Sequence, residues 1–163
     1  MRKYLVAMLI FWLLAWSHAQ NDNPVSVRLE SYIVSEVTGE DGNRQERFTA
    51  ASAARPGQVV EYRLFVTNND ETTLPSGTVV ILGPIPETTR YVDNSATPSS
   101  ERVLTEFSAD GGQSFSEAPL LQTLEDGSEE VIDPSAYTTV RWTVLQPLEP
   151  AMELSFFYRV VVN

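Results

Sequence analysis

Acidic side chains are the main chemical resource of this 163-residue chain. Asp110 is followed by Gly111 and Gly112, a pattern that can offer carboxylate and backbone oxygens to calcium but is also typical of a hairpin turn. Calcium takes about six to eight oxygen ligands, and the ligand spacing of an EF-hand loop does not occur around Asp110. We therefore expect a turn here, with a calcium site as the alternative.

A second group of acids lies in the stretch "LEDGSEEVIDPSA", which contains Glu125, Asp126, Glu129, Glu130 and Asp133. These side chains could collect a cation or a basic partner, and Asp126 and Glu129 join Asp110 as calcium candidates. A run of like charges is more often a solvated loop, and that is the interpretation we favour.

Composition excludes several catalytic chemistries. The chain has no cysteine, and its single histidine, His18, and its single lysine, Lys3, both lie within the first 19 residues. The remainder therefore has no imidazole, thiol or lysine amine for nucleophilic triads, Schiff bases, haem or ordinary zinc sites, and no disulfide framework. A hydrolase that uses only carboxylates is the remaining enzymatic alternative. No aromatic cluster surrounds a pair of acids in the sequence, and we expect no enzyme.

The N-terminus has the features of an export signal. Arg2 and Lys3 precede the apolar run "YLVAMLIFWLLAW", and Ser17 and Ala19 occupy the small-residue positions of a cleavage site. The run is shorter than the roughly 20 residues of a membrane-spanning helix. We predict a cleaved signal peptide over residues 1–19 and one domain over residues 20–163, with an uncleaved anchor as the alternative. No later stretch is apolar enough to span a membrane, so we expect a periplasmic or extracellular product.

The predicted mature chain is strongly acidic. The sequence has 22 Asp and Glu against 11 Lys and Arg, and two of those cations, Arg2 and Lys3, belong to the leader. Nine arginines against 22 acids leave a net charge of −13. Such a surface repels phosphate backbones, so we expect no nucleic-acid partner. High solubility is the simplest consequence of this charge.

Strand-like alternation runs through the predicted mature chain. In Val59 to Asn68, Val60, Tyr62, Leu64 and Val66 share one face, which indicates a sheet with one buried side. "TVVILGPIP" is a nearly continuous apolar run, and its prolines predict a strand that ends at about Leu82. Similar short segments recur about every ten residues, and no helical period follows the leader. We predict an all-β, immunoglobulin-like or transthyretin-like antiparallel sandwich of about seven to nine strands with Greek-key connections.

Aromatic residues divide into core and surface candidates. Trp142, Tyr62, Tyr137 and Tyr158 could form a sugar-stacking platform, but Trp142 and Tyr62 alternate with aliphatic residues, so we favour core packing for this group. Tyr91 and Phe157 are the better surface candidates. Phe157 lies between Ser155 and Arg159 on the predicted outer face of the last strand, where an exposed ring indicates contact with another chain.

The segment "ARPGQVVEYRLFVTNND" resembles the opening strand of the bacterial cell-surface conserved-repeat domain, also called domain of unknown function eleven. The matching positions are Pro56, Gly57, Tyr62, Thr67 and Asn68. "TVVILGPIPETTRYVDNSA", "FSADGGQSF" and "VRWTVLQPLEPAMELSFFYRVVV" are similar to later segments of that family. The chain departs from the pattern at Gly83, where the family usually has Asp, and at Ala151, where it often has Gly.

The resemblance covers about residues 54–162 and implies an exported, envelope-associated sandwich with no established catalytic residues. Members usually occur as tandem arrays, whereas this chain has one copy, which favours an accessory or binding subunit over a spacer. We expect a non-catalytic structural or adhesion-accessory binding module with an envelope or surface protein as its partner. A carbohydrate-binding module is the alternative, and a carboxylate-only hydrolase is a third interpretation.

Overall fold

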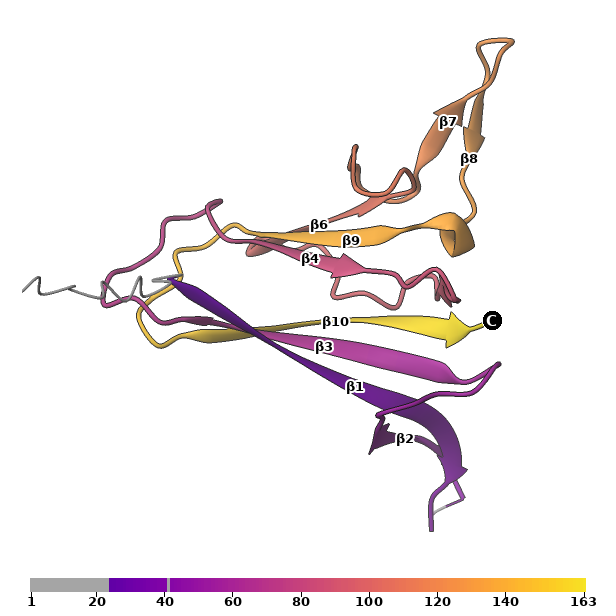
Figure 1. Cartoon of the computed structure of the whole chain (residues 1–163), viewed down its shortest axis with the longest axis horizontal. Coiled ribbons are helices and arrows are strands. Elements are labelled where there is room, and N and C mark those ends of the chain that lie inside the picture. Colours follow the sequence, from indigo (N-terminus) through magenta and orange to yellow (C-terminus); the bar gives the residue numbers. More distant parts are fainter. Residues whose placement is uncertain (1–23, 41) are drawn as a thin grey trace, which may run out of the picture.

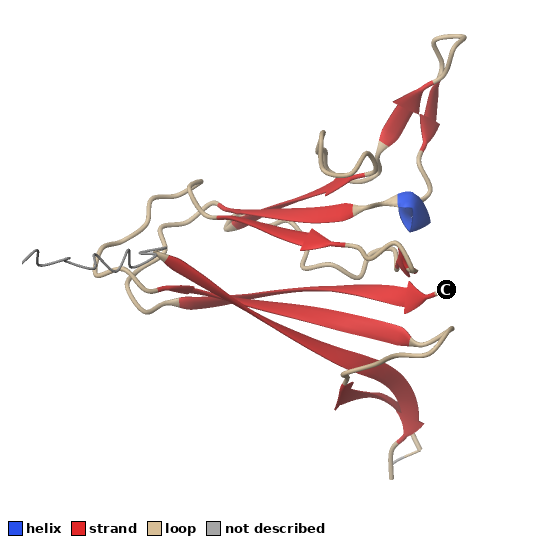
Figure 2. Ribbon diagram, viewed as in Figure 1, coloured by secondary structure: helices blue, strands red, loops and turns tan. Residues whose placement is uncertain are grey.

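The computed structural model describes residues 24–40 and 42–163. The predicted signal peptide and residues 20–23 lie outside the described residues. The described chain has ten strands, one short 3-10 helix and no α-helix (Figure 2). The prediction of an all-β antiparallel sandwich is therefore confirmed. The strand count exceeds the expected seven to nine because three strands are only three residues long.

Two sheets and one separate hairpin make up the fold (Figure 1). The large sheet has five antiparallel strands in the order β2 (Arg44–Ala50), β1 (Val25–Thr38), β3 (Val59–Asn68), β10 (Glu153–Val162) and β5 (Thr89–Tyr91). The small sheet has three, in the order β4 (Val80–Pro84), β9 (Thr139–Val144) and β6 (Val103–Ser108). The hairpin consists of β7 (Leu121–Thr123) and β8 (Glu129–Val131), and the 3-10 helix η1 (Pro134–Ala136) follows it.

Aromatic side chains join the two sheets. Trp142 on β9 is fully buried, with ring centroids 5.5 Å from Phe156 and 6.0 Å from Tyr158, both on β10. The indole N–H donates to the carbonyl of Thr97 at 3.2 Å. Tyr158 also stacks on Tyr62 of β3 at 5.3 Å. The expected core role of these aromatic residues is confirmed.

Gly83 allows the small sheet to approach this aromatic core. A Cβ atom at this position would lie 2.8 Å from Cε1 of Tyr158 and 2.9 Å from Cζ3 of Trp142. The Tyr158 hydroxyl donates to the carbonyl of Pro84 at 2.6 Å, so this ring is held in place.

β4 ends later than the sequence predicted. It continues to Pro84 and not to Leu82. Pro84 lies opposite Thr139 on β9. The hydrogen bonds from β4 to β9 are made by the residues next to Pro84, and the Ile85 amide, for example, donates to the carbonyl of Thr138 at 2.9 Å. The missing N–H of Pro84 would point to the free edge, so the proline is tolerated in this edge strand.

The sheets are offset, and this offset decides what is exposed. Phe107 of β6 packs on Tyr91 of β5 with ring centroids 5.3 Å apart, and Trp142 of β9 packs on β10. By strand order, β4 then aligns with β3, while the printed contacts of Gly83 and Pro84 reach across to Tyr158 on β10. β1 and β2 extend beyond the small sheet, and no described strand covers their inner face.

The β1–β2 ribbon bends over the opposite, outer face of the large sheet (Figure 1). Arg159 on β10 reaches both carboxylate oxygens of Glu46 on β2 at 2.7 and 2.8 Å, although β1 and β3 separate these two strands in the sheet. Glu61, which faces outward on β3, is only 3% exposed beneath this ribbon. The alternation in the sequence predicts that the outer face of β3 is solvated, and for Glu61 this prediction is wrong.

In the described part of the chain, no helix has the length and apolar character needed to span a bilayer.

Candidate interaction site

Two aliphatic side chains on β1 are exposed on the face that elsewhere forms the core. Val27 pairs with Val66 and Leu29 pairs with Leu64 in the ladder between β1 and β3. Directly opposite residues point to the same face, and the two β3 residues are buried. Val27 is 55% exposed and Leu29 is 60% exposed. We call Val27 and Leu29 the β1 ledge, because they extend past the small sheet.

The small sheet has an unpaired edge at β4, on the side of the sandwich where β1 lies in the large sheet. Val144 donates its amide to Val79 at 3.0 Å and Ile85 donates to Thr138 at 2.9 Å, so the odd-numbered residues bond β9. Alternate residues of an antiparallel strand direct their backbone groups to opposite edges. Val80 and Leu82 therefore direct theirs away from β9, to an edge where no described strand pairs. We call this the β4 edge.

The side chains of the β4 edge are aliphatic as well. Val80 is 51% exposed and Leu82 is 53% exposed, on the outer face of the small sheet. An open backbone edge with exposed aliphatic residues is a template for pairing with another chain. The β1 ledge and the β4 edge together make the candidate site.

The outer edge of the large sheet differs in chemistry from the β4 edge. β2 has the sequence RQERFTA, in which charged and polar residues predominate, and every residue is exposed. Charged side chains on an edge strand oppose pairing. The contrast identifies the β4 edge as the pairing-competent one of the two.

Acidic residues flank the end of the site at which β4 begins. Asp70 and Glu71 lie in the loop that leads toward β4, and Glu149 accepts a hydrogen bond from Thr73 of the same loop at 2.7 Å. The described ion pairs do not include any of these three carboxylates. This end of the site therefore has negative potential.

A second surface lies on the outer face of the large sheet. Phe157 is 38% exposed there, as predicted, and lines a cavity of about 350 Å³ together with Phe48, Phe65, Arg63 and Arg159. The Arg63 guanidinium lies 4.7 Å from the ring centroid of Phe48. We call this group the outer-face cluster.

Ion pairs organise the outer-face cluster. Glu61 accepts from Arg63 at 2.6 Å and from Arg159 at 2.8 Å. Hydrogen bonding to Glu46 raises the pKa of Arg159, and the same bond lowers the pKa of Glu46. Both arginines are thus paired with carboxylates, and arginine side chains also lie against the Phe48 and Phe65 rings.

The prediction that Tyr91 is a surface contact is wrong. Its side chain is only 4% exposed and packs on Phe107 and Tyr137. Its hydroxyl accepts a hydrogen bond from the Ala96 amide at 3.2 Å, and burial raises its pKa. Tyr91 ends a three-residue strand, whose pairing with β10 sets the face of its ring. A segment this short has no alternation from which to read that face.

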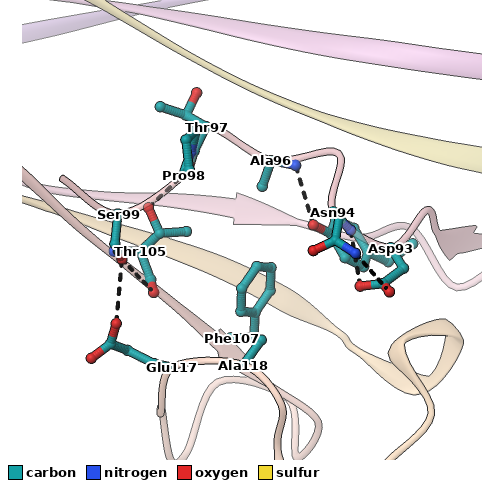
Figure 3. A pocket seen from close by; sticks show the side chains of 11 residues that line it. Asp93, Asn94, Ala96, Thr97, Pro98, Ser99, Thr105, Phe107, Glu117 and Ala118 are labelled. Atoms are coloured by element: carbon teal, nitrogen blue, oxygen red, sulfur yellow. Dashed lines mark hydrogen bonds between the residues drawn. The ribbon is translucent and has the colours of Figure 1, made fainter.

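Two acids line the cavity of about 260 Å³ beside Tyr91 (Figure 3). Asp93 accepts hydrogen bonds from the backbone and side-chain amides of Asn94, and Glu117 accepts one from Ser99 at 3.5 Å. Figure 3 shows Phe107 between the two carboxylates. Each carboxylate therefore accepts its hydrogen bonds from a different residue of the cavity wall, Asn94 for Asp93 and Ser99 for Glu117.

The three calcium candidates lie in two separate places, Asp110 in the loop after β6 and Asp126 and Glu129 in the β7–β8 hairpin. Asp110 accepts from Ser108, Gln113 and Ser114, and the Ser114 hydroxyl in particular holds its pKa well below the usual range. Gly111 and Gly112 have positive φ angles, as the predicted turn requires. Asp126 caps the β7–β8 turn through Ser128, and Glu129 begins β8. The described residues contain no group of three or more potential metal ligands.

A scan against protein-family models, a search of curated proteins and a search of solved structures each found no significant match.

The sequence indicated a strand at β4 but not the exposure of its side chains. "VVIL" is apolar on both faces, which is typical of a fully buried strand. The prolines at positions 84 and 86 were the available signal of an edge strand. The exposure of Val27 and Leu29 follows from the offset between the sheets, which no local pattern encodes.

Proposed function

We propose that this protein is an exported, non-catalytic β-sandwich that binds a protein of the cell envelope, as a structural or adhesion-accessory module. The observation that carries this proposal is the pair of exposed aliphatic rows on one open side, the β1 ledge and the β4 edge. An unpaired strand edge with exposed aliphatic side chains is a template for pairing with another chain.

The sequence supports the same class of role. A leader with a cleavage motif precedes the domain, and residues 20–163 contain no histidine, cysteine or lysine. The resemblance to the cell-surface conserved-repeat domain also favours an envelope-associated protein.

Affinity capture from gently lysed native cells tests the proposal. The tagged protein is compared with a ledge variant, Val27→Ser with Leu29→Ser, and with a matched control on the projecting hairpin, Leu121→Ser with Val131→Ser. The control residues are 53% and 57% exposed, so both variants remove similar apolar surface. We expect one stoichiometric envelope protein with the wild type and the control, and at least a tenfold loss with the ledge variant. Equal capture by all three proteins, or capture of nothing, contradicts the proposal.

Carbohydrate binding is the second candidate, because Phe48, Phe65 and Phe157 line one cavity on an exposed sheet face. Rings on such a face can stack on sugars. A glycan array that compares the wild type with Phe157→Ala tests this candidate. A signal that the variant loses supports it, and an empty array removes it.

A further inference from the structure

We infer that the β4 edge accepts one extended segment of the partner as an added strand, and that this segment has alternating aliphatic residues and a basic flank. The inference rests on the proposed function and specifies the chemistry of the partner. It follows from the backbone, the β1 ledge and the local charge, each of which restricts the occupant separately.

The backbone requires an extended chain. Val80 and Leu82 each present an N–H and a C=O to the open edge, two residues apart. This spacing matches the alternate residues of an antiparallel strand, and a helix cannot offer its backbone groups to it. A segment that adds to an exposed edge obtains its affinity from such main-chain bonds and its specificity from alternate side chains.

The β1 ledge sets the side-chain pattern of that segment. By strand order β4 aligns with β3, so a strand added beside β4 would align with β1. Residues of the added strand opposite Ile81 would point inward and cover Val27 and Leu29. Residues of the added strand opposite Val80 and Leu82 would point outward, next to the Val80 and Leu82 side chains. An aliphatic residue at every inward position therefore completes the core that the sandwich leaves open.

The same ledge excludes a second copy of this sandwich. Suppose that two molecules paired through their β4 edges. The β3 strand of the second molecule would then lie beneath its own β4, in the space that β1 of the first molecule already occupies. A single strand brings no second layer and meets no such obstacle. The occupant is therefore a segment of a different protein, extended and without a sheet beneath it.

Charge complementarity supplies the basic flank. Asp70, Glu71 and Glu149 lie at the end where β4 begins, and the described ion pairs include none of them. A segment antiparallel to β4 places its C-terminal part at this end. Lysine or arginine there would be attracted, whereas acidic residues would be repelled.

The C-terminus provides a direct test. Asn163 donates its amide to Thr88, close after β4, and Figure 1 shows the C-terminus at the end toward which β4 runs. A strand of about seven alternating threonine and valine residues with terminal lysines is fused to Asn163 through a linker of about ten glycine and serine residues. Such a linker reaches up to about 33 Å and gives the strand a roughly millimolar effective concentration. The probe strand then runs antiparallel to β4.

The readout is amide hydrogen exchange at Val80 and Leu82, measured by NMR. We expect exchange at both amides to slow at least tenfold in the fusion. The protection should fall when the central valine of the probe is replaced by proline, when the probe's lysines are replaced by glutamate, or when Val27→Ser and Leu29→Ser are introduced. Unchanged exchange at both amides at this effective concentration overturns the inference.

The two proposals fail in different ways. Ledge-dependent capture of an envelope protein together with unprotected Val80 and Leu82 amides would retain the binding role and reject strand addition. Protected amides without any captured envelope protein would retain strand addition and reject the envelope partner.

Discussion

Replacement of Gly83 by alanine tests the packing on which the fold depends. The added Cβ atom would lie 2.8 Å from a carbon of the Tyr158 ring and 2.9 Å from a carbon of the Trp142 ring. Trp142 is completely buried, and the Tyr158 hydroxyl is held by the Pro84 carbonyl at 2.6 Å. Neither ring can move away without losing contacts or this hydrogen bond. Overpacking of this kind costs about 1–3 kcal/mol.

Thermal and urea unfolding measure this cost. For a domain of this size, a loss of 1 kcal/mol lowers Tm by about 2–4 °C, so we expect Gly83→Ala to melt roughly 2–12 °C below the wild type. The matched control is Val80→Thr on the same strand. The Val80 side chain is exposed and threonine has nearly the same shape, so this variant should alter stability by no more than about 0.5 kcal/mol.

A second substitution shows whether the clash is the cause. Trp142→Phe removes part of the ring that the new methyl group would meet. The double variant should therefore be less destabilised than the sum of the two single variants, by about 0.5–3 kcal/mol. A Tm for Gly83→Ala within 1 °C of the wild type, or strict additivity in the cycle, would refute the packing of β4 on the aromatic core.

Three further predictions concern buried and capping side chains. Glu61→Gln removes the charge that Arg63 and Arg159 share and should cost about 3 kcal/mol in urea unfolding; a change below about 0.5 kcal/mol would contradict it. The lowered pKa of Asp110 means that its charged form stabilises the fold above the ordinary Asp pKa of about 4 and that this stabilisation is lost as the pH falls further. The Tm difference between the wild type and Asp110→Asn should therefore shrink between pH 7 and pH 2, and a constant difference would disprove this role. Tyr91→Phe should cost about 1 kcal/mol in thermal unfolding, because the Ala96 amide loses its acceptor, and should leave partner capture unchanged; weaker capture would show that Tyr91 contributes to binding.

Much of the fold could be predicted from the sequence because burial on one side imposes alternation. The period of Val59 to Asn68 identified β3 and its inner face, and the same reasoning placed Trp142 in the core and Phe157 on the outer face. Turn chemistry also gave a correct local prediction, since Gly111 and Gly112 adopt the expected positive φ angles.

The remaining features depend on how distant segments meet. Glu61 is buried because the β1–β2 ribbon folds back over the outer face, and Tyr91 because a three-residue strand pairs with β10. The candidate site depends on the offset of the two sheets. A one-dimensional pattern shows which residues share a face, but it does not show whether another layer covers that face.

Photo-crosslinking in native cells tests the central claim most directly. A photoreactive amino acid is placed at Leu29 on the ledge, at Phe157 in the outer-face cluster, or at Ser128 in the exposed β7–β8 turn as the control. The account predicts one dominant crosslinked envelope protein from position 29, and none from position 128. Crosslinking from position 157 without any from position 29 would contradict it, and so would the absence of crosslinks at all three positions.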